Sequence, residues 1–209
     1  MSFVIIDYSV GNLASLQAGF DRAGLTTLIT AEAAVIEGAD VLILPGVGAF
    51  GPAMAALEAT GLIPLIHQHV ASNKPLLGIC LGMQLLYEIS EEYGFHPGLG
   101  FIKGRVQAIQ NAPKLPHMGW NTLSLTPESP LLDGIVDGDY VYFVHSFQAP
   151  MNAAVIASSH YGQTLPAVVR AGSVVGMQFH PEKSARVGEQ LLRNFGRWAN
   201  ETLSRNGSL

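Results

Sequence analysis

The sequence predicts an α/β fold in which a central, mostly parallel sheet is flanked by helices and gains antiparallel strands from the second half of the chain. Before Gly94, short runs that are apolar on both faces alternate with helical patterns, which is typical of buried parallel strands. After Gly94, strand patterns follow one another without intervening helices, which favours antiparallel pairing. The chain of 209 residues has the length of one domain with a substantial core, so we expect residues 1–209 to form a single domain.

The first half of the chain is expected to supply the parallel part of the sheet. Apolar runs predict four buried strands, at residues 3–7, 25–29, 41–44 and 75–79. Helical patterns between them cover residues 12–23, 54–59 and 62–72. Asn12 can cap the first of these helices and Gly24 can end it, and Gly61 separates the other two.

The only cysteine of the chain stands between the fourth strand and a helix that apolar spacing predicts over residues 82–90. Cys80 is flanked by Gly78 and Gly82 in a Gly-x-Cys-x-Gly pattern. This is the strand-to-helix elbow of hydrolases, in which a sharp turn strains the nucleophile and larger side chains two positions away would collide. The N–H groups at the start of the helix would favour a reactive thiolate. The alternative is that Cys80 is a small apolar residue of the core.

The second half is expected to contribute mostly antiparallel strands, at residues 106–110, 120–125, 139–147, 154–158, 165–170 and 174–179. Gly172 and Ser173 would form a tight hairpin turn between the last two. A final helix is expected over residues 188–203, because Leu191, Phe195 and Trp198 recur at helical spacing. We interpret this apolar stripe as core packing.

Charge and composition exclude several kinds of partner. Hydrophobic residues make up 48% of the chain and charged residues 13%, which leaves either an apolar docking face or a polar surface with few charges. The net charge of −5 argues against nucleic acid. A single cysteine fits a reducing cytoplasm. The first residues lack the features of a signal peptide and no stretch is long enough to span a membrane, so no membrane partner is expected.

A glycine-rich loop, residues 45–51, follows the third strand. At the carboxyl end of a parallel strand, such a loop marks a place where the backbone approaches another group closely, although it can also be a tight turn into the next helix. It lacks the Gly-Lys-Ser/Thr of a phosphate-binding loop, so no cofactor is expected. No metal is expected either, because His67 and His69 would lie on different helix faces and no zinc-ligand spacing occurs.

A cysteine nucleophile needs a base, and the base needs an orienting group. One of the seven histidines has a carboxylate in such a place, in the segment Phe179-His180-Pro181-Glu182. The proline fixes one backbone angle, so that Glu182 can turn back and orient the His180 ring. We interpret His180 as the base that takes the thiol proton and delivers it to the leaving amine. The alternative is a loop histidine with a structural hydrogen bond.

With Gly78-Ile-Cys-Leu-Gly-Met-Gln84 and Phe179-His-Pro-Glu182, the chain resembles the class I, triad-type glutamine amidotransferases. Further motifs are similar to those of the glutaminase subunits of imidazole glycerol phosphate synthase, in histidine biosynthesis: Pro45-Gly-Val-Gly48, Pro116-His-Met-Gly-Trp-Asn121, Tyr142-Phe-Val-His-Ser-Phe147 and Gly176-Met-Gln-Phe-His-Pro-Glu-Lys-Ser184. The motifs around Trp120 and Lys183 separate this group from the glutaminases of anthranilate, GMP or carbamoyl phosphate synthesis. The resemblance spans the chain and implies a flavodoxin-like fold.

The resemblance implies that glutamine is hydrolysed to glutamate and ammonia, through a glutamyl thioester, by a triad of Cys80, His180 and Glu182. The negative oxygen of the intermediates needs N–H donors, of which Leu81 is the first by elbow geometry. The second is expected from Gly46-Val47-Gly48, where the Val47–Gly48 peptide must turn over and the flanking glycines make that rotation easy. By the same resemblance, the glutamine is held by Gln84, Glu92, His145, Ser146 and Phe147.

A second polypeptide should use the ammonia, because ammonia in bulk water becomes protonated and the sequence has no motif for a phosphorylated acceptor. The resemblance identifies this partner as a (β/α)8-barrel cyclase subunit, which makes imidazole glycerol phosphate and AICAR in a heterodimer and whose ligand switches the glutaminase on. Residues in loops that flank the site are expected to face it: Asn12, Trp120, Asn121 and Lys183. The alternative for Trp120 is a place in the core.

Two other interpretations are open from the sequence. The chain could be the glutaminase subunit of another amidotransferase, or a γ-glutamyl hydrolase that acts without a partner. It could also be a flavodoxin-like binding module in which Cys80 is structural and residues 45–51 cradle a ligand.

Overall fold

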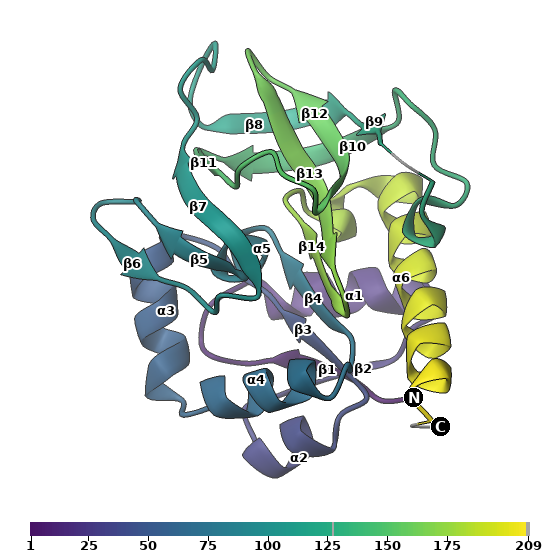
Figure 1. The fold of residues 1–209 in the computed structure, drawn as a ribbon. Helices are drawn as coiled ribbons and strands as arrows, with labels where there is room; N and C mark the ends of the chain where they lie inside the picture. The colour runs from purple at the N-terminus through teal and green to yellow at the C-terminus, as the bar shows by residue number, and fades with distance from the viewer. Residues whose placement is uncertain (127, 208–209) are drawn as a thin grey trace.

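The computed structural model describes residues 1–126 and 128–207. It has the expected mixed α/β fold, in which a large sheet is flanked by helices (Figure 1). The strands are β1 (Phe3–Ile6), β2 (Thr27–Thr30), β3 (Val41–Leu44), β4 (Leu76–Ile79), β5 (Tyr87–Ser90), β6 (His96–Pro97), β7 (Ile102–Ala108), β8 (His117–Thr122), β9 (Ser124–Leu125), β10 (Tyr140–His145), β11 (Phe147–Gln148), β12 (Val155–His160), β13 (Thr164–Ala171) and β14 (Val174–Met177). The helices are α1 (Leu13–Arg22), α2 (Ala33–Gly38), α3 (Phe50–Ala59), α4 (Ile63–Ala71), α5 (Leu81–Leu85) and α6 (Ala185–Arg205), with the short 3-10 helices η1 (Pro130–Leu132) and η2 (Pro181–Lys183).

Eight strands form the central sheet, in the order β2-β1-β3-β4-β14-β13-β12-β9. The first five are parallel to one another, and the other three continue the sheet with antiparallel pairing. β4 leads to Cys80 and β14 leads to His180, and in their parallel pairing Ile79 lies opposite Met177. Cys80 and His180, which are a hundred positions apart in the sequence, therefore lie at the same edge of the sheet.

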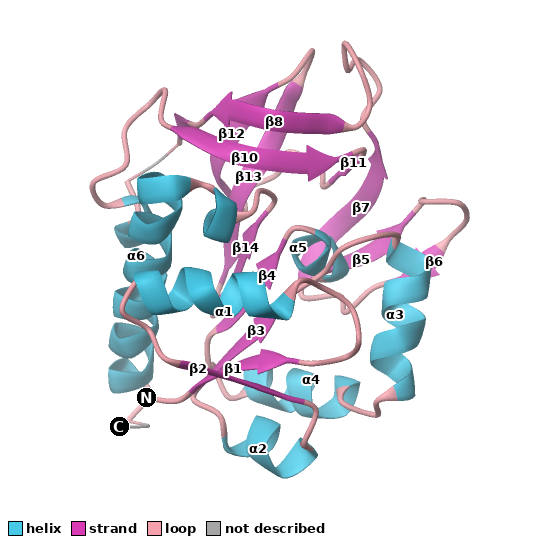
Figure 2. Cartoon of the chain, turned by 180° about the vertical axis from the view of Figure 1, so that it is seen from behind, coloured by secondary structure: helices cyan, strands magenta, loops and turns pink. Residues whose placement is uncertain are grey.

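Helices cover both faces of the parallel part of the sheet, with α1 and α6 on one face and α2, α3 and α4 on the other (Figures 1 and 2). Consecutive residues of β3 point into different layers. Leu42 packs in the cluster that contains residues of α2, α3 and α4, whereas Ile43 packs in the cluster that contains residues of α1 and α6. Burial on both faces explains why these strands are apolar at every position.

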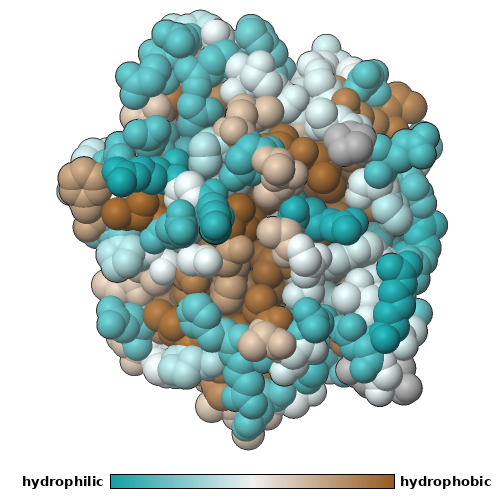
Figure 3. Space-filling view, viewed as in Figure 1, coloured by the Kyte–Doolittle hydropathy of each residue, from teal (hydrophilic) through white to brown (hydrophobic). Residues whose placement is uncertain are grey.

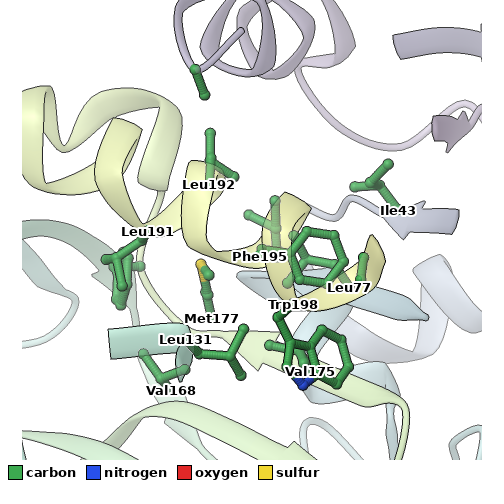
Figure 4. Close-up of a cluster of buried hydrophobic side chains, with 14 of the residues drawn as sticks. Ile43, Leu77, Leu131, Val168, Val175, Met177, Leu191, Leu192, Phe195 and Trp198 are labelled. Atoms are coloured by element: carbon green, nitrogen blue, oxygen red, sulfur yellow. The ribbon is translucent and has the colours of Figure 1, made fainter. Parts of the chain in front are cut away.

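The longest helix, α6, presents an apolar stripe to the sheet (Figure 4). The stripe consists of the buried side chains Leu191, Leu192, Phe195 and Trp198. They belong to one cluster with Leu77 of β4 and Val175 of β14. The stripe is therefore core packing, and it supports the two strands that lead to the candidate site.

The helix expected over residues 82–90 is wrong in its second half. α5 ends at Leu85, and Tyr87–Ser90 form β5, which pairs with β6 and β7. Apolar spacing in so short a stretch fits a helix and a strand equally well. The pairing with β7, which lies later in the chain, decides for the strand.

Smaller differences concern elements that depend on distant contacts. α2 was not predicted, because only Ile36 of its residues is buried and the apolar period is weak. The second strand lies at Thr27–Thr30 rather than at 25–29, and the two-residue strand β6 was not predicted. The helix expected from residue 54 starts at Phe50, whose N–H donates to the carboxylate of Glu92 at 2.7 Å.

The surface is not uniformly polar. On the face drawn in Figure 3, apolar side chains show between the polar ones across the middle of the molecule. The exposed large apolar residues include Met118 and Trp120 on β8. In the part of the chain that the structure describes, no helix has the length and apolar character needed to cross a membrane.

Candidate active site

A buried cysteine with a strained backbone stands between β4 and α5. Cys80 has φ of 55° and ψ of −113°, and residues other than glycine rarely adopt such a positive φ. A Cβ on Gly78 would lie 2.6 Å from the carbonyl oxygen of Gly82, and a Cβ on Gly82 would lie 2.0 Å from that of Leu44. The elbow therefore requires glycine on both sides of Cys80, as the pattern predicts.

The helix after the elbow is shorter than expected, with five residues. It cannot offer the dipole of a long helix, but the N–H groups of its first turn have no partner within the helix. The glycine-rich loop lies directly against this turn, because a Cβ on Gly46 would be 2.6 Å from the backbone nitrogen of Gly82. The loop and the elbow therefore form one continuous backbone wall.

Cys80 faces a cavity of about 300 Å³. The predicted residues that line it are Val47, Gly48, Cys80, Leu81, Gln84, Glu92, His145, Ser146, Phe147 and His180. Of the other two residues predicted for catalysis or glutamine binding, Gly46 packs against the elbow and Glu182 contacts His180. The structure thus brings together residues that come from distant parts of the sequence.

His180 and Glu182 form a buried pair in which Nδ1 of the imidazole lies 2.9 Å from Oε1 of the carboxylate. Burial by itself would lower the pKa of His180, but the interactions with Cys80 and Glu182 outweigh it and raise this pKa to about 10. Nε2 has no partner of hydrogen-bonding geometry among the described residues. The raised pKa makes the imidazole a strong base, and its Nε2 is left for the sulfur of Cys80.

The segment that carries this pair is held by α1. A Cβ on Gly19 would lie 2.6 Å from Cβ of Glu182, so α1 can approach η2 only with glycine at this position. Arg22, one turn later, donates from Nη2 to the backbone carbonyl of Glu182 at 2.8 Å. These two contacts fix the carboxylate behind the imidazole.

Gln84 and Glu92 are both buried and have backbone partners. Gln84 donates from Nε2 to the carbonyl oxygen of Phe147 at 2.9 Å and to Oε1 of Gln178 at 3.0 Å. Glu92 accepts the N–H of Phe50 at Oε2, which caps α3. Each side chain therefore joins a cavity wall to a neighbouring element, and Glu92, which the sequence leaves in an unplaced loop, lines the cavity.

The four residues expected at a partner face are in different situations. Lys183 is exposed, and with Asn12 it lines a second cavity of about 30 Å³ that shares Val47 and His180 with the first. Trp120 is 52% exposed, so it is not a core residue. Asn121 is engaged within the chain, because its Nδ2 donates to His117 and to the carbonyl of His160.

Three residues that line the cavity were not predicted: Tyr93, Pro116 and Val144. Tyr93 directly follows Glu92, and the other two lie within motifs that were quoted for the resemblance. The positions of these three residues, next to predicted site residues or within the motifs, could therefore have identified them as cavity residues. His117, which lies behind His145, was not singled out either, because only the fold brings these two histidines together.

The chain is similar to known proteins of one family. A family model described as glutamine amidotransferase class-I matches residues 4–198. The imidazole glycerol phosphate synthase subunit HisH of Oceanobacillus iheyensis is 49% identical over 193 residues, which are 91% of this chain and 96% of that protein. The subunit of the same name from Aquifex aeolicus is 45% identical over 202 residues, which are 95% of this chain and 98% of that protein.

A solved structure described as a glutamine amidotransferase has the same fold. It superposes with a TM-score of 0.74 at 22% sequence identity, over 94% of this chain and 98% of that one. At this identity the likeness concerns the fold alone.

Proposed function

The chain belongs to the class-I glutamine amidotransferases and, within them, to the HisH subunits of imidazole glycerol phosphate synthase, and we propose that its triad is Cys80, His180 and Glu182. It is the glutaminase subunit of that enzyme, in histidine biosynthesis. The observation that carries the proposed triad is the strained cysteine on the same cavity as the buried His180–Glu182 pair. A structural cysteine in a passive binding module would not need this strain.

The reaction follows from the positions of these groups. His180 takes the proton of the Cys80 thiol, and the thiolate attacks the side-chain amide carbon of glutamine to form a C–S bond. When the tetrahedral intermediate collapses, the C–N bond breaks and the imidazolium gives its proton to the leaving nitrogen, which departs as ammonia. A water molecule that gives a proton to His180 then attacks the thioester carbon. When this second intermediate collapses, the C–S bond breaks, glutamate leaves, and the Cys80 thiolate takes the proton back from His180.

The negative oxygen of both intermediates would be stabilised by two backbone N–H groups. Leu81 supplies the first, at the start of α5. The second would come from the Val47–Gly48 peptide after a rotation. Gly48 has φ of +88° and no atom within 4 Å of where a Cβ would lie, and Val47 is 45% exposed, so this peptide has room to turn over.

The remaining cavity residues would hold the glutamine. Oε2 of Glu92 is occupied by the N–H of Phe50, which leaves Oε1 for the α-ammonium group of the substrate. Gln84 and the backbone of residues 145–147 form the opposite wall. The reaction needs no cofactor.

The partner would be a (β/α)8-barrel cyclase subunit that consumes the ammonia, as the name of the relatives implies a further subunit. Trp120 and Lys183, which are exposed, and Asn12 at the second cavity would face it. If the Val47–Gly48 peptide rests in the wrong orientation, the chain alone is nearly inactive and the partner's ligand turns the peptide.

The protein would act in the cytoplasm. Its single cysteine is free and forms no disulfide, which fits a reducing compartment.

A diazoketone analogue of glutamine tests this proposal. The expected result is a covalent adduct at Cys80, formed faster when the cyclase subunit and its ribonucleotide ligand are present, and no adduct in Cys80→Ser. Full glutaminase activity in Cys80→Ala would overturn the proposed nucleophile. Equal turnover with and without the cyclase would overturn the switch and favour a hydrolase that acts alone.

A further inference from the structure

Behind the cavity, the side chains of His145, His117 and Asn121 form a row that joins three segments of the chain. Nδ1 of His145 lies 2.9 Å from the carbonyl oxygen of Phe147, and Nε2 of His145 lies 2.9 Å from Nδ1 of His117. Nε2 of His117 in turn lies 3.1 Å from Nδ2 of Asn121, which also donates to the carbonyl of His160 at 2.9 Å. The row therefore runs from the cavity wall to the tip of the β12–β13 hairpin.

The direction of every hydrogen bond in this row is determined by its ends. Asn121 accepts the N–H of Thr122 at Oδ1, 2.8 Å away, so its amide group must present Nδ2 to His160 and to His117. His117 then accepts at Nε2 and carries its proton on Nδ1, which donates to His145. His145 likewise accepts at Nε2 and donates from Nδ1 to Phe147, whose carbonyl oxygen can only accept. Each imidazole is neutral and has one tautomer.

The surroundings hold this arrangement in place. The ring of His117 is stacked between Phe143 and Tyr161, with ring centroids at 4.6 Å and 4.1 Å. Both histidines are buried, with 2% and 7% of their surface exposed. The hydroxyl of Tyr161 donates to the carbonyl of Lys114, two residues before Pro116 of the cavity wall. The same hairpin tip thus supports two parts of that wall.

The other end of the row meets the elbow. The carbonyl oxygen of Phe147 accepts a second hydrogen bond from Gln84 of α5, the helix that begins beside Cys80. Phe147 is thereby fixed from both sides, by α5 and by the two histidines. In Figure 2, β8, β10 and β11 lie together above α5, which matches this path.

We propose that His117 is a positioning residue for glutamine: through His145 and the Phe147 carbonyl, with its tautomer set by Asn121, it holds the Ser146–Phe147 wall in the orientation that binds substrate. This inference rests on the proposed function. His117 is behind the cavity rather than in it, so it touches no reacting atom. Its loss should weaken glutamine binding more than the chemical step.

Two measurements on the complex with the cyclase subunit test it. In the 15N-histidine-labelled wild-type chain, long-range 1H–15N correlations should show Nδ1–H tautomers for His117 and His145. His117→Phe keeps the stacked ring but donates nothing to His145, and KM for glutamine should rise about tenfold with kcat changed much less. His117→Asn can still donate a hydrogen bond to His145, so its KM for glutamine should be close to that of the wild type. The control variant His67→Phe removes an exposed imidazole that is packed against Phe101, and its KM should be unchanged.

The outcomes separate the positioning role of His117, which we call the relay through His145 to Phe147, from the proposed function on which it rests. A wild-type complex that does not hydrolyse glutamine contradicts the proposed function, whatever the tautomers are. With an active wild type, Nε2–H or charged histidines at pH 7 overturn the relay, even if no variant folds. An unchanged KM in His117→Phe, or a His117→Asn variant that is equally impaired, assigns His117 to packing and also overturns it.

Discussion

Nδ1 of His180 lies 2.9 Å from Oε1 of Glu182, and a single proline separates the two residues. Proline at this position starts the short η2 helix, which bends the chain so that the carboxylate meets the ring. Both side chains are buried, so the carboxylate acts on the imidazole with little screening by water. The pKa of His180, raised to about 10, is the result of this contact and of Cys80 outweighing burial.

Glu182→Gln should therefore remove a negative charge without removing the hydrogen-bonding shape. The pKa of His180 should fall, and the amide can hold the ring in the wrong tautomer, so we expect kcat to drop by about 10² to 10⁴. Turnover of glutamine by the saturated complex measures this. Glu201→Gln is a matched control, because Glu201 pairs with Arg205 at 3.8 Å near the end of α6 and does not contact His180. Equal losses in both variants would contradict the role of Glu182.

Cys80→Ser should abolish the use of glutamine by the complex but not the use of ammonium salts. If the chain supplies only ammonia, a cyclase subunit given external ammonium at alkaline pH does not need the sulfur. We expect glutamine-dependent product formation to fall by at least about 10³-fold and ammonium-dependent formation to stay near wild type. Loss of both activities to the same extent would show that the substitution disturbs the partner rather than the chemistry.

Much of the site could be predicted because its parts lie in local patterns that the fold preserves. The elbow is encoded by Gly78 and Gly82, and the His180–Glu182 contact needs only three residues. The sequence could not show that Asn121 bonds to His160, because that contact requires the long β12–β13 hairpin to lie beside β8. The same limit applies to β5, whose residues form a strand because β6 and β7, later in the chain, pair with it.

Gly82→Ala should destabilise the fold far more than a glycine substitution in open space. The new Cβ would lie 2.0 Å from the carbonyl oxygen of Leu44, which is backbone and cannot move aside. We expect a loss of about 3 kcal/mol or more in the free energy of unfolding. Gly38→Ala is the control: no atom lies within 4 Å of its added Cβ, and alanine is the better helix former, so stability should rise by up to about 1 kcal/mol. Urea titrations of both variants measure the difference.

Trp120→Ala should weaken the complex and leave the isolated chain nearly as stable as before. The side chain is 52% exposed and meets the ring of Tyr142 only edge-on, at a centroid distance of 6.0 Å. A tryptophan at an interface commonly contributes enough that its removal weakens binding about tenfold or more. Leu28→Ala is the control, because Leu28 is 53% exposed but lies on β2, an edge strand of the central sheet, whereas β8 pairs with β10 in a separate two-stranded sheet. Equal affinities of both variants for the cyclase subunit would place Trp120 outside the interface.

Buried histidines should make the fold lose stability as the pH falls from about 6.5 to 4. Burial lowers the pKa of His69 to about 4, and the nearby Lys74 lowers it while the Pro75 carbonyl and Asp40 act in the opposite direction. Burial also lowers the pKa values of His117 and His145 to about 4. Between pH 6.5 and 4 the unfolded chain binds protons that the folded chain does not, so acid favours unfolding. His180 has a raised pKa: its stabilisation is fully present below pH 6.5 and is lost as the pH rises through about 10.

His69→Gln tests the contribution of one buried histidine that does not line the cavity. The ring of His69 uses Nε2 toward the carbonyl of Pro75 at 2.9 Å, and the amide of glutamine can make the same contact without titrating. Between pH 6 and 4.5, the free energy of unfolding should therefore decline less steeply in the variant, by up to about 1.4 kcal/mol per pH unit. Above pH 7.5 the two curves should run parallel, because neither the folded nor the unfolded chain protonates this site there. Parallel curves in acid as well would mean that the folded chain protonates His69 as readily as the unfolded chain does, which the burial of this side chain argues against.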